Sequence, residues 1–262
     1  MPYSPRPVSG KNMPTPERQT NVMAQGAEWF ATTHWSVVLS AKAGGSSQAN
    51  EALEKLCGGY WYPLYAYVRR KGHNPHDAQD LTQEFFARLL KGNFLATIEQ
   101  RKGRFRTFLL ASLEHFLAKE WARVNSQKRG RGAVLVSLDN RDAEGRYAQE
   151  PADPTSPQKL YERRWAMTLL DRALDRLKQE CLSADQGELF ERAKNLLSGD
   201  QEETSYAEMG KALGLTEGAF KVAVHRLRQR YGKLLRLEIA ETVSLPDEVE
   251  EEIRFLFSAL RD

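Results

Sequence analysis

Residues 205–230 read SYAEMGKALGLTEGAFKVAVHRLRQR, and this stretch predicts a helix, a tight turn and a second helix. Gly214 supplies the turn, because glycine adopts positive φ without a steric penalty. Thr216 is a favourable N-cap for the second helix, and Glu217 lies in its first turn, where a carboxylate interacts well with the helix dipole. The second helix has an apolar face at helical spacing, made of Phe220, Val224 and Leu227.

The opposite face of that second helix is basic. Together, the turn, the cap and the basic face are typical of a helix-turn-helix, whose second helix enters the major groove of DNA. The alternative is an ordinary helical hairpin with a solvated basic face, and we favour DNA binding because the three signals agree. The basic face comprises Lys221, His225, Arg226, Arg228 and Arg230.

Charge is unevenly distributed along the 262 residues, although the net charge is only +3. Residues 101–131 hold nine basic and two acidic side chains, which gives +7, and residues 218–236 hold six basic side chains and no acidic one. Residues 238–252 carry seven acidic side chains and no basic one. The two basic blocks predict a polyanionic partner, and the acidic block predicts a competitor for it.

Cysteine content and hydropathy narrow the class of protein. Cys57 and Cys181 are far apart and form neither a disulfide framework nor a metal quartet, so we expect both in the core. We recognise no signal peptide and no apolar run long enough to cross a membrane. We therefore expect a cytoplasmic protein with no metal and no cofactor.

The periodicity along the chain predicts an all-α fold. Residues 1–25 are rich in proline and polar side chains, which predicts a disordered leader. A short apolar helix is expected near residues 29–39. A long helix is expected over residues 48–71, with Pro63 as the place for a kink.

The next helix is expected over residues 75–91, because Asn74 and Pro75 form a typical helix start. The composition of its polar face fits either a solvated surface or a protein-docking surface, and does not decide between them. That face comprises Asp80, Gln83, Glu84 and Arg88.

Basic and aromatic side chains alternate in residues 101–108, RKGRFRTF, at the start of a helix that should end near Asn125. Such a pattern suits single-stranded DNA, since bases stack on the rings while the cations contact phosphates. The alternative places the two aromatic rings in the core. We expect Phe108 to be a core residue and leave Phe105 open.

Residues 126–156 have little apolar periodicity and end in PADPTS, which predicts a flexible linker. We therefore expect two small helical domains, the second with helices from residue 157, near residues 188–197 and in the helix-turn-helix. Residues 241–262 should form an acidic amphipathic helix, with Ser244 and Asp247 at its start. We considered two places for this tail: over the basic recognition helix, as a self-inhibitor, or packed against the second domain.

This layout resembles the bacterial RNA polymerase sigma factors of the extracytoplasmic-function (ECF) type, over about residues 28–237. Residues 80–86, DLTQEFF, match the family's most specific motif, which docks on the clamp helices of the polymerase β′ subunit. Residues 103–109, GRFRTFL, match the lead into the helix that reads and helps melt the −10 promoter element. Residues 205–230 match the domain that reads the −35 element.

The resemblance implies a domain assignment. Residues 26–125 would be region 2, which binds core polymerase and the −10 element, and residues 157–240 would be region 4, which binds the −35 element. The leader (1–25), the linker (126–156) and the acidic helix (241–262) complete the chain.

The resemblance also implies the residues of each interface. Core polymerase would be bound by Asp80, Gln83 and Glu84. The −10 element would be bound by Lys102, Arg104, Phe105, Arg106, His115, Lys119 and Arg123. The −35 element would be bound by Thr216, Lys221, Val222, His225, Arg226 and Arg228.

Two stretches depart from the family pattern. Glu114-His115 stands where an Arg-Asn or similar pair is common, and the −10 base preference should differ accordingly. Residues 219–223, AFKVA, stand where Thr-Val-Lys-Ser-Arg is frequent, so the recognition helix lacks the usual arginine.

The resemblance implies a sigma factor without catalytic residues, whose partners are promoter DNA and the polymerase core, through the β′ clamp helices and the β subunit. It also raises an anti-sigma factor as a partner. A stand-alone helix-turn-helix regulator is the main alternative, but such a protein does not need the DLTQEFF helix. A nucleic-acid-processing enzyme would require an acidic metal-binding cluster, and the dense acidic run is confined to the tail.

Overall fold

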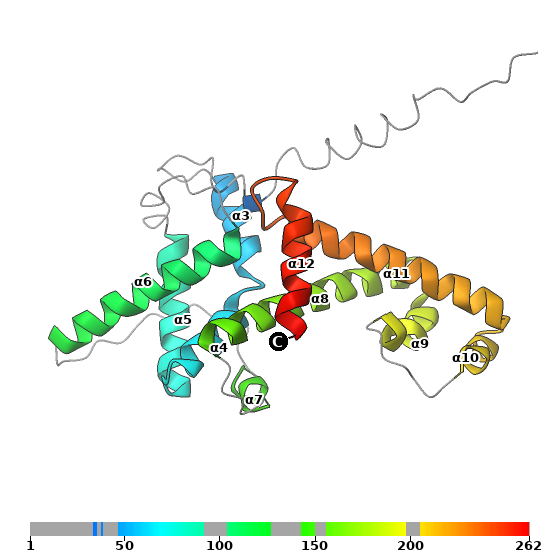
Figure 1. Cartoon of the computed structure of the whole chain (residues 1–262), viewed down its shortest axis with the longest axis horizontal. Coiled ribbons are helices and arrows are strands. Elements are labelled where there is room, and N and C mark those ends of the chain that lie inside the picture. Colours follow the sequence, from blue (N-terminus) through cyan, green and yellow to red (C-terminus); the bar gives the residue numbers. More distant parts are fainter. Residues whose placement is uncertain are drawn as a thin grey trace, which may run out of the picture. The chain divides into compact units, whose positions relative to one another are not determined.

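The computed structural model describes His34, Trp35, Val38 and residues 47–91, 104–126, 143–149, 156–197 and 205–261. All of them lie in one packed unit, Thr33–Asp262. Regular structure in these ranges is entirely α-helical, which confirms the predicted all-α class (Figure 1). The predicted leader, most of the 29–39 helix and most of the predicted linker lie outside the described residues. The helices are α3 (Ser47–Cys57), α4 (Trp61–Arg70), α5 (Pro75–Leu90), α6 (Phe105–Ser126), α7 (Ala143–Ala148), α8 (Pro157–Ser183), α9 (Gly187–Leu197), α10 (Tyr206–Ala212), α11 (Glu217–Ala240) and α12 (Glu248–Arg261).

The long helix expected over residues 48–71 is two helices, α3 and α4. The break falls at Gly58 and Gly59, where the N–H of Tyr60 bonds to the carbonyl of Cys57 at 2.9 Å. Pro63 produces no kink, because it lies in the first turn of α4, where a helix N–H has no intrahelical acceptor. Residues 61–68 of α4 are all buried, since α4 packs against both α5 and α8.

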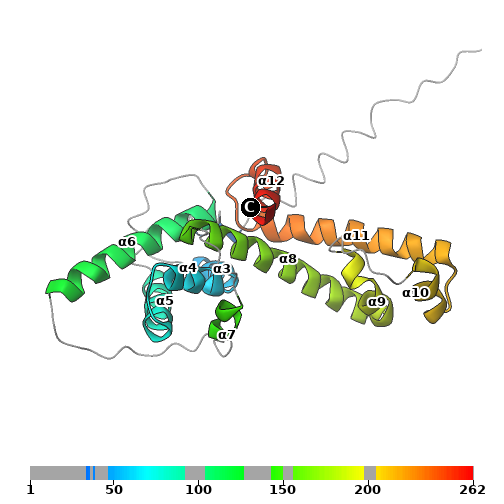
Figure 2. The ribbon, with the colours of Figure 1, turned by 60° about the horizontal axis from the view of Figure 1, so that its bottom comes forward.

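Helix α8 packs against helices from both sides of the predicted linker. Near its N-terminus, the Tyr161 hydroxyl donates to the carbonyl of Arg106 in α6 at 2.9 Å. One turn further on, the indole of Trp165 donates to the hydroxyl of Tyr60 at 2.9 Å. Further along, α8 and α11 run side by side (Figures 1 and 2), and Arg230 forms an ion pair with Glu180 at 2.6 Å. The two predicted helical groups therefore share one long packing helix.

A short helix, α7, lies inside the range expected to be a flexible linker. It docks on α4, because the Glu144 carboxylate accepts from the Arg69 guanidinium at 2.8 and 3.0 Å and from the Tyr65 hydroxyl. The hydrogen bond from Arg69 holds the pKa of Glu144 below its usual value. The guanidinium of Arg146 lies 3.9 Å from the ring centroid of Tyr62. The α7 segment is thus anchored by charge and ring contacts that a composition-based linker prediction does not detect.

Helices α5 and α6 are joined by a charged bridge. The Arg88 guanidinium of α5 lies 2.5 Å from Glu84 in its own helix and 2.8 Å from Glu120 in α6. Glu120 also pairs with Arg123 at 2.7 Å. Burial of Glu120 raises the pKa of this carboxyl, but the bonds from Arg123 and Arg88 outweigh it, and the net pKa lies below the usual value. The two helices that carry the first two predicted interfaces are therefore electrostatically coupled.

The hydrogen bond between Trp165 and Tyr60 predicts that the stability lost on Tyr60→Phe depends on which residue is at position 165. Tyr60→Phe should lower the free energy of unfolding by about 1–3 kcal/mol, because it leaves a buried indole N–H without an acceptor. In a Trp165→Phe background, where no N–H remains to be satisfied, Tyr60→Phe should cost much less. Urea unfolding of the four proteins measures both values, and equal costs in the two backgrounds would contradict the assigned bond.

The α5–α6 bridge predicts a pH dependence. The folded-state pKa of Glu120 is lowered from 4.5, so its contribution to stability is present above that pH and is lost as the pH falls through the folded value. Glu120→Gln should remove this contribution and flatten the acid limb of the stability curve. The measurement is the difference in free energy of unfolding between wild type and Glu120→Gln, followed from pH 7 downwards. A difference that stays constant with pH would argue against the bridge.

Candidate nucleic-acid interface

Helix α5 presents part of the predicted polymerase-docking set to solvent. The Asp80 carboxylate lies 3.2 Å from His76 Nδ1, and 47% of its side chain remains exposed. Glu84 is partly exposed and bonded to Arg88. Gln83 is only 8% exposed, so it contributes to packing. Asp80 and Glu84 are thus the members of this set that a partner helix can reach.

The start of α6 buries Phe105, which the residue pattern left open and which the resemblance placed at the −10 element. Phe105 is fully buried, with its ring centroid 5.0 Å from Trp35 and 4.9 Å from Tyr60. Phe108, expected in the core, is only half-buried. The reason is helical phase: Phe105 shares the buried face with residues 109, 113 and 116, whereas Phe108 lies at the edge of that face. The expectation that Phe108 is a core residue is therefore corrected, and in this packing the core ring is Phe105, which is not exposed to a base.

Arg106 is also buried, and its charge is matched inside the protein. Its guanidinium lies 2.5 Å from the carboxylate of Glu252 in α12, and neither side chain is more than 8% exposed. The guanidinium is 3.6 Å from the ring centroid of Phe255 and 5.1 Å from that of Trp165. Arg106 is therefore enclosed by a carboxylate and two aromatic rings.

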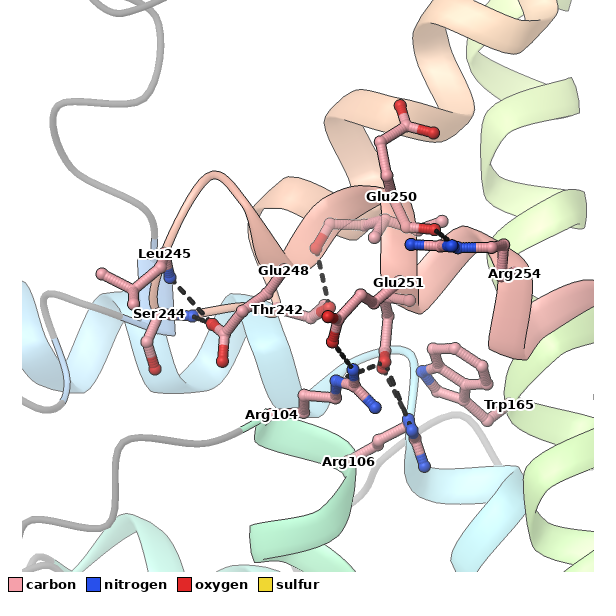
Figure 3. Close-up of polar contacts among 12 residues, drawn as sticks. Arg104, Arg106, Trp165, Thr242, Ser244, Leu245, Glu248, Glu250, Glu251 and Arg254 are labelled. Atoms are coloured by element: carbon pink, nitrogen blue, oxygen red, sulfur yellow. Dashed lines mark hydrogen bonds and ion pairs between the residues drawn. The ribbon is translucent and has the colours of Figure 1, made fainter.

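Arg104 completes a junction between α6 and the acidic C-terminal helix (Figure 3). Its guanidinium lies 2.7 Å from Glu251 and 2.9 Å from Glu252. Just after α11, the carbonyl of Thr242 accepts from the N–H of Phe105, the first residue of α6, at 2.9 Å. We call this group, comprising Arg104 and Arg106 with Thr242, Glu251 and Glu252, the tail junction.

The acidic helix forms an ion pair with the second basic block (residues 218–236) at the last residue of that block, Arg236. Glu250 lies 3.1 Å from Arg236, well beyond the predicted base-reading residues of α11. Helix α12 packs on α8 and α11, and its apolar side chains Val249, Ile253 and Leu256 are buried. Of the two places considered for this tail, the structure has the one packed against the second group of helices and not the one over the base-reading residues of the recognition helix. Burial of the apolar stripe decides the position, because the glutamates alone fit either basic block.

The remaining predicted residues of α6 lie further along the helix. His115 and Lys119 are exposed, and Arg123 is exposed but bonded to Glu120. Lys102 lies outside the described residues. Glu114, which departs from the family pattern, accepts from the Tyr67 hydroxyl at 2.6 Å.

Trp121 is a residue that the sequence reasoning missed as a surface feature. It is 72% exposed, although the sequence places it at the end of an apolar run. Its helical phase was the available signal, because Phe116 and Glu120 are on the buried face and Trp121 lies about 100° further round. A large exposed ring on this helix suits stacking on an unpaired base.

The turn between α10 and α11 forms as predicted. Ser205 caps α10 in a reciprocal capping box with Glu208, and Thr216 caps α11 by accepting from the N–H of Ala219 at 3.2 Å. Gly214 has φ of 68°, the left-handed region that favours glycine. At Gly210, an added Cβ would lie 3.1 Å from the carbonyl oxygen of Leu215, so α10 and the turn approach each other closely at this glycine.

The six residues predicted to contact the −35 element are all exposed, and they differ in their partners. Thr216 uses its hydroxyl as the cap just described. Lys221 pairs with Glu217 at 2.6 Å, and Arg228 donates to the carbonyl of Leu196 in α9 at 2.7 Å. Among these residues, Val222 is 50% exposed. The complete exposed set is Thr216, Lys221, Val222, His225, Arg226 and Arg228.

Within the ranges that the structure describes, no group of three or more His, Cys, Asp or Glu side chains is placed to hold a metal ion. Across the same ranges, no helix combines the length and the apolar character needed to cross a lipid bilayer.

Comparison with known proteins places a family domain on this geometry. Residues 62–126, which span α4 to α6, match the model of Sigma-70 region 2. The chain is 27% identical over 179 residues to the ECF RNA polymerase sigma factor SigE of Mycolicibacterium smegmatis. That alignment covers 68% of this chain and 60% of the relative, so the chain spans less than two thirds of the length of this curated protein. No solved structure gave a significant match.

The two matches agree with the motifs at residues 80–86 and 103–109, which lie on or beside α5 and α6. Together they show that residues 62–126 are similar to Sigma-70 region 2 and that the chain is similar to an ECF-type sigma factor.

Proposed function

We propose that this protein is a sigma factor that binds core RNA polymerase and directs transcription initiation at specific promoters. The observation that carries the proposal is the DLTQEFF motif on α5, inside the region 2 match and coupled to α6 through Arg88 and Glu120. A partner that docks on α5 is thereby coupled to the helix proposed to hold DNA. The chain would act in the cytoplasm, where polymerase and promoters are found.

Each interface has a defined role in this proposal. Asp80 and Glu84 contact the β′ clamp helices, and Gln83 supports them from the buried side. The exposed part of α6, with His115, Lys119 and the Trp121 ring, holds the unpaired −10 strand through cations and stacking.

The α10–α11 pair reads the −35 duplex in the major groove. Val222 and Arg226 are exposed on the recognition helix. Lys221 and Arg228 reach DNA after exchanging the partners Glu217 and Leu196 for phosphate. The long α11 helix, which continues to Ala240, anchors this reader on α8 through Arg230 and Glu180.

A stand-alone helix-turn-helix regulator remains the alternative function, favoured by the well-formed α10–α11 turn. It would bind duplex DNA without core polymerase. The DLTQEFF helix has no role in that alternative, so binding to core polymerase discriminates between the two.

Charge reversal on α5 tests the docking role. Asp80→Arg should weaken binding to core polymerase at least tenfold, because a half-exposed carboxylate at the proposed contact becomes a cation. Fluorescence anisotropy with labelled protein and purified core polymerase measures the affinity. Asp175→Arg, an equal charge reversal at an exposed position of α8, is the matched control and should bind normally. Failure of the wild type to bind core polymerase would exclude the sigma-factor function.

Substitution of two arginines tests the role of the recognition helix: Arg226, which is proposed to contact DNA, and Arg230, which pairs with Glu180. Promoters are first identified by run-off transcription of a genomic library with core polymerase and mapping of the start sites. Arg226→Ala should then reduce transcription from such a promoter about tenfold or more, since an arginine contact to a base is worth about 1–3 kcal/mol. Arg230→Ala, which loses the ion pair with Glu180, should have a smaller effect on promoter choice. Equal start-site profiles for wild type and Arg226→Ala would remove Arg226 from the base-reading set.

A further inference from the structure

The C-terminal segment covers the start of α6. Arg104 and Arg106, which belong to the stretch predicted to lead into the −10 helix (residues 103–109), lie there. The carbonyl of Thr242 accepts from the first N–H of α6, at Phe105. The glutamates of α12 bind the guanidinium groups of Arg104 and Arg106 (Figure 3). The main-chain donor and both cations at this helix start are therefore already bonded within the chain.

The ion pair at Arg106 is buried, unlike an ion pair at the protein surface. Glu252 is completely buried and lies between two guanidinium groups, at 2.9 Å from Arg104 and 2.5 Å from Arg106. Phe255, one turn further along α12, places its ring 3.6 Å from the Arg106 guanidinium. A carboxylate with no exposed surface is retained only where its counter-charges are in place, so α12 and these arginines are matched to each other.

The contact at Arg104 is more open. Its side chain is 26% exposed, and its partner Glu251 is 60% exposed. An incoming polyanion would reach Arg104 first, and displacement of Glu251 would then weaken the support of Glu252. The junction thus has an exposed outer pair, Arg104 with Glu251, and a buried inner pair, Arg106 with Glu252.

We propose that α12 is an internal competitor of single-stranded DNA for Arg104 and Arg106, and that the DNA strand binds this part of α6 only after the tail junction has opened. The proposal rests on the proposed function, because it assumes that α6 holds the unpaired promoter strand. Carboxylates and phosphates bind guanidinium groups with the same fork geometry, so a strand of phosphates can replace Glu251 and Glu252. Free protein would therefore bind single strands weakly.

The affinity test uses the full chain and a fluorescein-labelled, 20-nucleotide single-stranded DNA of mixed sequence. Glu251→Gln with Glu252→Gln should raise the affinity about tenfold, within the range of typical coupling between two ligands. Glu250→Gln is the matched control, since Glu250 pairs with Arg236 of α11, and it should leave the affinity unchanged. Thermal unfolding of each variant verifies that it is folded. Equal affinity of wild type and double variant, including no measurable binding by either, would overturn the proposal.

A second measurement needs no substitution, so it stands even if the double variant does not fold. Hydrogen exchange of wild-type protein is followed over residues 246–258 with and without the same oligonucleotide at a saturating concentration. Opening of the tail junction predicts faster exchange of these amides when DNA is bound. Unchanged or slower exchange in the bound state would overturn the proposal. Binding to core polymerase, measured separately, tells the two failures apart: normal polymerase binding with a closed junction rejects only the role of α12.

Discussion

A buried cation must find its counter-charge within the protein, and Arg106 makes that constraint central to this fold. Its guanidinium is bonded to Glu252 of α12, its carbonyl accepts from Tyr161 of α8, and its side chain packs on Phe255 and Trp165. Removal of either charge would leave the other desolvated and unpaired, which is among the most destabilising changes a core can suffer. Through this one residue, α6, α8 and α12 hold a single arrangement.

That arrangement places the acidic tail at the start of α6 instead of on the recognition helix. Both basic blocks attract acidic side chains, but a glutamate can be buried only where apolar surface is buried with it. The stripe of Val249, Ile253 and Leu256 finds such surface on α8 and α11, and the glutamates on the neighbouring side of α12 then meet Arg104 and Arg106. In the same arrangement, Asp80, Lys119, Trp121 and Arg226 keep exposed surface and remain available to partners.

Local signals predicted the starts of α5 and α11, whose caps were expected, whereas α12 begins at Glu248, beyond the Ser244 and Asp247 expected at its start. The Asn74 side chain accepts from the N–H of Asp77 at 2.9 Å, and Thr216 and Ser205 cap their helices in the same way. The motif residues at 80–86 were placed on the correct helix for the same reason. The failures came where two local signals competed or where contacts were distant. The glycine pair at Gly58 broke a helix that Pro63 was expected to bend, and α7 formed in a predicted linker because Glu144 meets Arg69.

By itself, the sequence determined the helical class, the caps and turns of the individual helices, and the motifs that point to region 2 and to a helix-turn-helix. These depend on interactions within a few residues, which any window of the chain contains. Only the tertiary structure decided that Phe105 packs against Trp35 and Tyr60, and that Glu252 belongs to Arg106 across 146 positions of sequence. Charge alone could not select that partner, because both basic blocks of the chain attract an acidic helix. Burial of the apolar stripe of α12 selects it, and that depends on the packing of α8 and α11.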